Sequence, residues 1–121
     1  MAEWNVLVVE DDPDGQEVVV RILKHHNIPA DVAGTGEEAL ALLDRNVYSI
    51  AVIDLALPEI DGWRLLDAIR KSPKTAGMPC VAVTAFHSAE VATKAIKSGF
   101  AAYFPKPLDA TSFVRELQRF V

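Results

Sequence analysis

The chain has 121 residues, a formal net charge of −5 and 50% hydrophobic residues. This length corresponds to one domain, which buries roughly two-thirds of its unfolded surface, so a core can form without disulfides or a structural metal. Cys80 is the only cysteine, which excludes a disulfide framework, a CxxC redox pair and a cysteine-based zinc cluster. The negative charge argues against nonspecific nucleic-acid binding, and we expect no direct contact with nucleic acid.

The apolar segments of the sequence are too short to cross a bilayer. Its first residues, MAEWN, lack the positive flank and apolar stretch of a signal peptide. With a single cysteine and no export signal, we expect a cytoplasmic protein without membrane insertion.

Five short apolar runs are predicted to be strands, and five segments with apolar residues at three- and four-residue intervals are predicted to be helices. The strands are residues 4–9, 29–33, 49–54, 80–85 and 101–104. The helices are residues 16–26, 37–45, 62–71, 89–98 and 110–121. Strict alternation of strand and helix predicts an α/β fold, a doubly wound five-stranded parallel sheet with helices on both faces.

Three helix starts carry capping signals. Asp12 can cap the first helix with Pro13 in its first turn, and Asp109 can cap the last. Thr35 and Glu38 form a T-x-x-E capping box at the second helix. These signals fix where three of the five connections enter a helix.

Acidic residues concentrate in the first half of the chain and follow apolar runs. Residues 1–61 contain 13 acidic and 3 basic residues, whereas residues 62–121 contain 4 acidic and 9 basic ones. In a doubly wound sheet, ligands bind beyond the carboxyl ends of the strands. The first run is followed by Glu10, Asp11 and Asp12. The third ends in Asp54, the fourth contains Thr84 near its end, and Lys106 closely follows the fifth. We expect all of them to converge at one edge of the sheet.

Three carboxylates in one cleft repel one another, and a divalent cation with oxygen ligands relieves that repulsion. Mg²⁺ fits best, because it takes one or two carboxylates with waters and a phosphate oxygen. Asp54 follows the apolar run SIAVI and is placed as a nucleophile for a phosphoryl group. The hydroxyl of Thr84 and the ammonium of Lys106 would share the charge on the phosphoryl oxygens.

The segments VVEDDP, AVIDLALPEIDG, VAVTA and YFPKP, in this order, resemble the receiver domains of two-component response regulators. The resemblance covers essentially the whole chain, and the chain is similar to a chemotaxis-type single-domain regulator. It implies a flavodoxin-like (βα)5 fold. It also implies that residues 1–121 are one receiver (response regulatory) domain, with no output domain in this chain.

The resemblance implies that Asp54 accepts a phosphoryl group from the phosphohistidine of a sensor kinase or a histidine phosphotransfer protein. Lys106 would pair with Asp54 or its phosphate, and the Lys106–Pro107 bond would be cis. The Mg²⁺ ligands would be Asp11, Asp54, the backbone carbonyl of Ala56, and Glu10 through water. The domain would catalyse only its own phosphorylation and dephosphorylation, and is not expected to turn over a small molecule.

In the receiver family, the residue matching Thr84 moves toward the phosphate and an aromatic residue, here Tyr103, rotates inward. This implies a change in the face formed by the fourth helix, fifth strand and fifth helix, which would bind a downstream protein. Basic side chains on that face suggest an acidic partner surface; they are Lys94, Lys97, Arg115 and Arg119. A monomer and a phosphorylation-dependent dimer both remain open.

Rival interpretations can be compared with this one. A pseudo-receiver that binds partners without being phosphorylated shares the fold, but here no essential residue is missing. The sequence from Gly34 to Ala39 matches a dinucleotide-binding pattern, yet Glu37 and Glu38 would face the pyrophosphate. A phosphatase of the haloacid dehalogenase type would need an acid at Ala56.

Three histidines could suggest phosphohistidine chemistry or a metal site. His25 and His26 close the first predicted helix, where imidazole complements the helix dipole. His87 stands alone in a predicted loop. We therefore interpret all three as surface residues.

Overall fold

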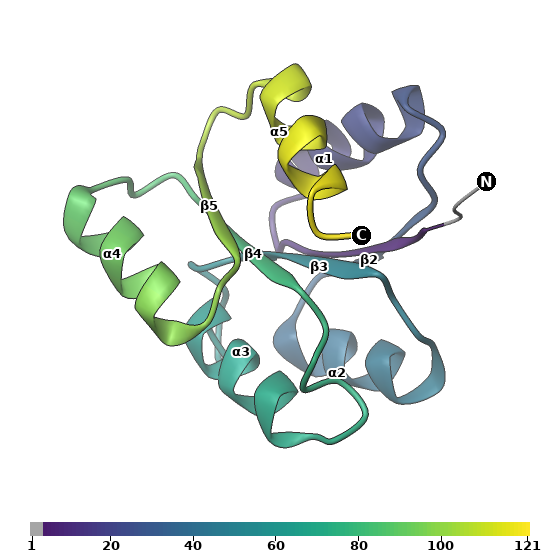
Figure 1. Cartoon of the computed structure of the whole chain (residues 1–121), viewed down its shortest axis with the longest axis vertical. Coiled ribbons are helices and arrows are strands. Elements are labelled where there is room, and N and C mark those ends of the chain that lie inside the picture. Colours follow the sequence, from purple (N-terminus) through teal and green to yellow (C-terminus); the bar gives the residue numbers. More distant parts are fainter. Residues whose placement is uncertain (1–3) are drawn as a thin grey trace.

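The computed structural model describes residues 4–121 and shows five parallel strands in one sheet with five helices around it (Figure 1). The strands are β1 (Val6–Val9), β2 (Ala30–Ala33), β3 (Ile50–Asp54), β4 (Cys80–Thr84) and β5 (Ala102–Pro105). The helices are α1 (Pro13–His25), α2 (Gly36–Arg45), α3 (Gly62–Lys71), α4 (Ala89–Ser98) and α5 (Ala110–Gln118). The strand order β2-β1-β3-β4-β5 confirms the predicted doubly wound α/β fold.

The element boundaries differ from the predicted ones by up to three residues. Helix α1 begins at Pro13 because Asp12 caps it, and β1 begins only at Val6. The amide of Asn5, before that strand, donates to Ser49 Oγ and its side chain to Val47 O. Among the residues described, no helix combines the length and apolar character that crossing a bilayer would require.

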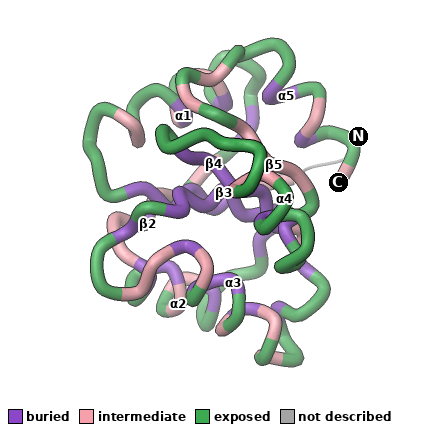
Figure 2. The backbone as a smooth tube through the Cα atoms, turned by 90° about the vertical axis from the view of Figure 1, so that its left-hand side faces the viewer, coloured by how far each residue is buried: buried purple, intermediate pink, exposed green. Residues whose placement is uncertain are grey.

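Alternating side chains of the strands build two apolar layers, one on each face of the sheet. Val6 and Val8 pack in the layer under α1 and α5, whereas Leu7 and Val9 pack in the layer under α2, α3 and α4. The three central strands, β1, β3 and β4, run as a buried band between the two helical layers (Figure 2), whereas the edge strands β2 and β5 are only partly buried. Because both faces are covered, the strands read as continuous apolar runs rather than alternating ones.

Each helix starts at a side-chain cap. Asp12, Thr35 and Asp109 accept backbone N–H bonds in the first turns of α1, α2 and α5, as predicted. The structure adds two caps that the sequence interpretation missed, Asp61 for α3 and Ser88 for α4. The caps of α1 and α3 lie in the loops that carry functional residues, so they help to set the path of those loops.

The start of α3 packs directly on the end of β3. A Cβ on Gly62 would lie 2.6 Å from the carbonyl oxygen of Asp54 and 2.7 Å from Leu55 Cα. Both are backbone atoms, which cannot move aside without shifting the end of the strand. The bare glycine therefore allows the close approach that sets the position of Asp54.

We expect Gly62→Ala to lower the free energy of unfolding by about 1–3 kcal/mol, because the new methyl overpacks backbone atoms. Urea unfolding followed by tryptophan fluorescence measures the change. Gly77→Ala is the matched control: nothing lies within 4 Å of its Cβ position, and a change within about 0.5 kcal/mol is expected. Equal stability of the two variants would contradict the close approach.

Candidate phosphoacceptor and metal site

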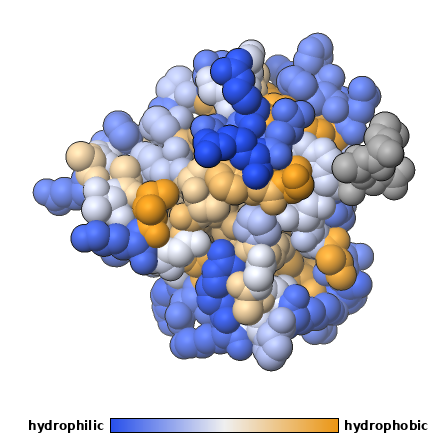
Figure 3. All heavy atoms as spheres, in the orientation of Figure 1, coloured by the Kyte–Doolittle hydropathy of each residue, from blue (hydrophilic) through white to orange (hydrophobic). Residues whose placement is uncertain are grey.

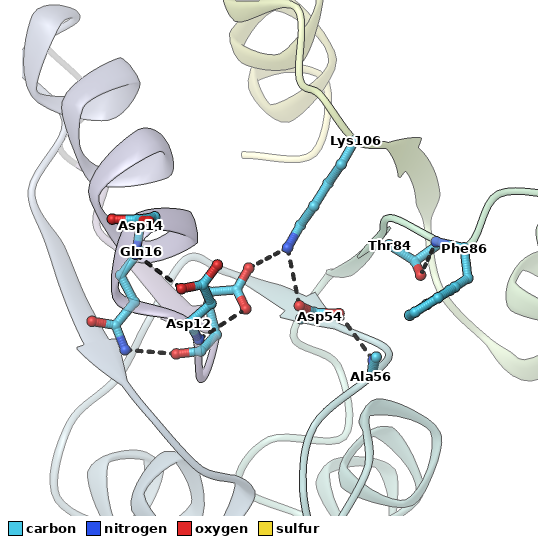
Figure 4. A network of polar contacts seen from close by, with 9 residues as sticks. Asp12, Asp14, Gln16, Asp54, Ala56, Thr84, Phe86 and Lys106 are labelled. Carbon is cyan, nitrogen blue, oxygen red and sulfur yellow. Dashed lines mark hydrogen bonds and ion pairs between the residues drawn. The ribbon is translucent and has the colours of Figure 1, made fainter.

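The carboxyl ends of the strands bring the predicted residues to one edge of the sheet. Asp54 is the last residue of β3 and Thr84 the last of β4. Glu10 directly follows β1, and its amide donates to Ala33 O at 3.0 Å. The amide of Lys106, after β5, donates to Thr84 O at 2.9 Å. Backbone bonds to neighbouring strands thus hold Glu10 and Lys106 just beyond the sheet. Figure 4 shows the side chains of Asp54, Thr84 and Lys106 at this edge.

The ammonium of Lys106 bridges two buried carboxylates. Its Nζ lies 3.1 Å from Asp54 Oδ2 and also pairs with Glu10 Oε1. The side chains of Asp54 and Glu10 are only 8% and 4% exposed, so their charges have lost most of their water. Removing one partner of such a pair would leave an uncompensated buried charge, which is costly.

The pKa of Glu10 is raised to about 7: burial is the largest cause, the neighbouring Asp54 carboxylate adds to it, and Lys106 acts in the opposite direction. For Lys106, burial acts to lower the pKa. Its hydrogen bonds and charge interactions with Glu10 and Asp54 outweigh burial and raise that pKa above its ordinary value. The site therefore holds its protons unusually tightly.

Two contacts orient the Asp54 carboxylate. Its Oδ1 accepts a 2.9 Å hydrogen bond from the amide of Ala56, while Oδ2 faces Lys106 (Figure 4). A hollow of about 170 Å³ lies alongside, lined by Leu55, Ala56, Trp63, Thr84, Phe86 and Val91. Phe86 at its rim is 74% exposed. Asp54 is therefore fixed in orientation beside a small, mostly apolar hollow.

Three acidic side chains can supply oxygen ligands to one cation. Glu10, Asp11 and Asp54 each offer a carboxylate oxygen, and these oxygens lie within 4.8 Å of one another. Glu10 and Asp54 are buried, whereas Asp11 is exposed and open to solvent. A set made only of oxygen donors, one of them open to solvent, fits Mg²⁺ with several retained waters.

Thr84, at the end of β4, and Tyr103, within β5, each make a side-chain hydrogen bond of their own. The Thr84 hydroxyl, buried at 2% exposure, accepts a 3.0 Å bond from the amide of Phe86. The Tyr103 hydroxyl and His87 Nδ1 are 2.9 Å apart and hydrogen-bonded. The interpretation of His87 as a lone loop residue was therefore incomplete: the residue is exposed, but it contacts the predicted switch tyrosine.

The basic side chains predicted on the α4–β5–α5 face are partly engaged within the chain. Lys94 lies over the Trp63 ring, 4.5 Å from its centroid, and Arg119 pairs with Glu116 at 2.8 Å. Lys97 and Arg115 are exposed. Figure 3 shows hydrophilic side chains around the rim of this side and less hydrophilic ones in its middle, over β5. The ion pair with Glu116 thus compensates the charge of Arg119, whereas Lys94 keeps its charge over the ring.

The chain matches the model of the response regulator receiver domain over residues 6–118. It belongs to this family. The receiver is 36% identical over 120 residues to an uncharacterized 14.6 kDa protein in the sodA1 3′ region of Leptolyngbya boryana, covering 99% of this chain and 92% of that protein. Longer regulators that it also matches are covered over 25% to 56% of their length.

Solved structures agree with this assignment. The receiver domain of the Francisella response regulator 1452 has a TM-score of 0.87 and 30% identity, over 98% of this chain and 96% of that one. The receiver domain of the sensor histidine kinase PA1611 of Pseudomonas aeruginosa has a TM-score of 0.89 and 27% identity, over 98% of both chains. That structure has a magnesium ion coordinated in its active site cleft.

Two further features of the receiver agree with what the sequence analysis predicted. The Lys106–Pro107 peptide bond is cis, as the family resemblance implied. The Gly34–Ala39 segment enters α2, where Thr35 Oγ1 accepts the amide of Glu38 at 3.0 Å. A helix cap, with two glutamates in the first turn, accounts for that segment.

In the metal-free receiver, we expect the free energy of unfolding to fall as the pH rises from about 4.5 to about 7. In that window the folded state retains the Glu10 proton that the unfolded chain has released. The loss should reach up to about 3 kcal/mol. Urea unfolding in EDTA at several pH values measures it. Glu10→Gln should flatten the dependence, while exposed Glu90→Gln should not; equal slopes in all three proteins would contradict the prediction.

Proposed function

We propose that this receiver accepts a phosphoryl group on Asp54 from the phosphohistidine of a histidine kinase or a histidine phosphotransfer protein, with Mg²⁺ as cofactor. The observation that carries the proposal is the buried Asp54 carboxylate, with Oδ2 3.1 Å from Lys106 Nζ and two other carboxylates beside it. Membership of the receiver family supports the same reaction.

In the proposed transfer, an oxygen of Asp54 forms a bond to phosphorus while the phosphorus–nitrogen bond of phosphohistidine breaks, and the imidazole leaves. The amide of Ala56 holds one Asp54 oxygen, which limits rotation of the nucleophile. Lys106 already points at Asp54 and would pair with an oxygen of the incoming phosphoryl group. The chain's own contribution is orientation and charge compensation.

For the metal, we propose Glu10, Asp11, Asp54 and the backbone carbonyl of Ala56 as its protein environment. When bound, Mg²⁺ would neutralise charge on the carboxylates and the phosphoryl oxygens. The cluster of three carboxylate oxygens supports this assignment. The receiver of the kinase PA1611, with magnesium in its cleft, supports it independently.

We propose further that phosphorylation draws Thr84 toward the phosphoryl group and turns Tyr103 inward, changing the α4–β5–α5 face for a downstream protein. For this change, two hydrogen bonds of the present structure would have to break. Thr84 would release the amide of Phe86, and Tyr103 would release His87. The receiver would act in the cytoplasm through protein contacts rather than by binding nucleic acid, with residues 1–121 forming one receiver domain.

The first test is intact mass after incubation with acetyl phosphate, with and without Mg²⁺. The wild type should gain a single phosphoryl group that is labile to base and hydroxylamine, only with Mg²⁺, and Asp54→Asn should gain none. Asp61→Asn is the matched control, because asparagine caps α3 as well as aspartate does. A wild type that stays unlabelled where another receiver is labelled would instead support the pseudo-receiver function.

The switch proposal is tested at the amide of Phe86. Beryllofluoride, a phosphoryl mimic, should speed its hydrogen exchange by about two- to tenfold, as expected for the loss of one hydrogen bond. Thr84→Ser should behave like the wild type. Thr84→Ala should show no change on adding beryllofluoride, because the acceptor is absent in both states. A wild-type Phe86 amide that does not respond with the mimic bound would show that Thr84 stays in place.

A further inference from the structure

Contacts hold Glu10 at its backbone and at its carboxylate. Its backbone amide donates to Ala33 O, and its carbonyl oxygen accepts a 2.7 Å bond from Gln16 Nε2. Its Oε2 accepts the amide of Asp12 at 3.3 Å, and Oε1 pairs with Lys106. The backbone of Glu10 therefore has little freedom to shift, and any displacement must occur in the side chain.

The first turn of α1 leaves space for this side chain because residue 15 is glycine. A Cβ on Gly15 would lie 2.5 Å from Glu10 Oε1, 2.8 Å from its Cδ and 3.1 Å from its Cγ. Side-chain carbons do not approach one another this closely, so the Glu10 carboxylate occupies the volume that a side chain at residue 15 would fill. Glycine within a helix is otherwise unfavourable.

We propose that Gly15 is a positioning residue for the Glu10 carboxylate, and that the identities of residues 10 and 15 are coupled. The inference rests on the proposed Mg²⁺ site. A methyl at residue 15 clashes with the far end of a flexible side chain, so the helix can form while Glu10 swings away. The carboxylate then leaves both Lys106 and the acidic cluster.

Shortening residue 10 by one methylene should relieve the conflict. Aspartate at this position has no atom in the place of Glu10 Oε1, which would lie closest to the new Cβ, and its carboxylate oxygens, bonded directly to Cγ, can rotate away from residue 15. Gly15→Ala should therefore be harmful with Glu10 and harmless with Glu10→Asp. A merely structural role of Gly15 would make the substitution equally harmful in both backgrounds.

Metal binding provides the first test. Mn²⁺ titrations followed by the EPR signal of the free ion, with Mg²⁺ as competitor, compare the wild type, Gly15→Ala, Glu10→Asp and the double variant. Gly15→Ala should weaken binding about tenfold or more, as expected when the support of a ligand is lost. The double variant should bind as tightly as Glu10→Asp. Gly77→Ala, with open space around its Cβ position, should bind like the wild type.

Thermal unfolding of the same proteins in EDTA provides a test that needs no metal. Gly15→Ala should raise the unfolding midpoint in the Glu10→Asp background, since alanine favours the helix, and raise it less or lower it with Glu10. Equal shifts in both backgrounds, or unchanged Mn²⁺ affinity of Gly15→Ala, would overturn the inference. A wild type that binds no Mn²⁺ would overturn the proposed function instead, and the EDTA cycle would still decide the role of Gly15.

Discussion

The receiver depends on a single ammonium group that compensates carboxylates crowded at one edge of the sheet. Lys106 contacts Glu10 and Asp54, which lie 96 and 52 positions away in sequence. Those contacts exist only when β1, β3 and β5 occupy the same sheet. The two carboxylates are buried, so each lacks the water that would otherwise stabilise its charge. The positive charge of Lys106 therefore reaches the two carboxylates only when the sheet has folded correctly.

The core sets this geometry because the strands that fill it also end in the site residues. β3 is buried along its whole length and terminates at Asp54, so packing on both faces leaves that carboxylate little room to shift. Gly62 lets α3 approach the end of β3 closely. On the other face, α1 begins under its Asp12 cap and passes beside Glu10. Both helical layers thus position the carboxylates.

Local sequence patterns could predict the fold and the residues at the strand ends, because the spacing of apolar residues and the capping residues of helices can be read from short segments of the chain. They placed Asp54, Thr84 and Lys106 at one edge, and the structure brings them there. They could not predict the bond between His87 and Tyr103, because it depends on the path of a loop against another strand. Nor could they predict the Glu10–Gly15 contact, which depends on a side-chain rotamer.

Charge balance also sets an order of events. When ionised, Glu10, Asp11 and Asp54 beside one Lys106 leave two uncompensated negative charges, and in the proposed transfer the phosphoryl group of the donor would add about two more until its bond to Asp54 forms. Lys106 cannot serve Glu10, Asp54 and a phosphoryl oxygen together. A divalent cation among the carboxylates would supply the missing charge and release Lys106 from Glu10. Metal binding would therefore precede phosphoryl transfer, because only then is the ammonium free to turn to the phosphoryl oxygen.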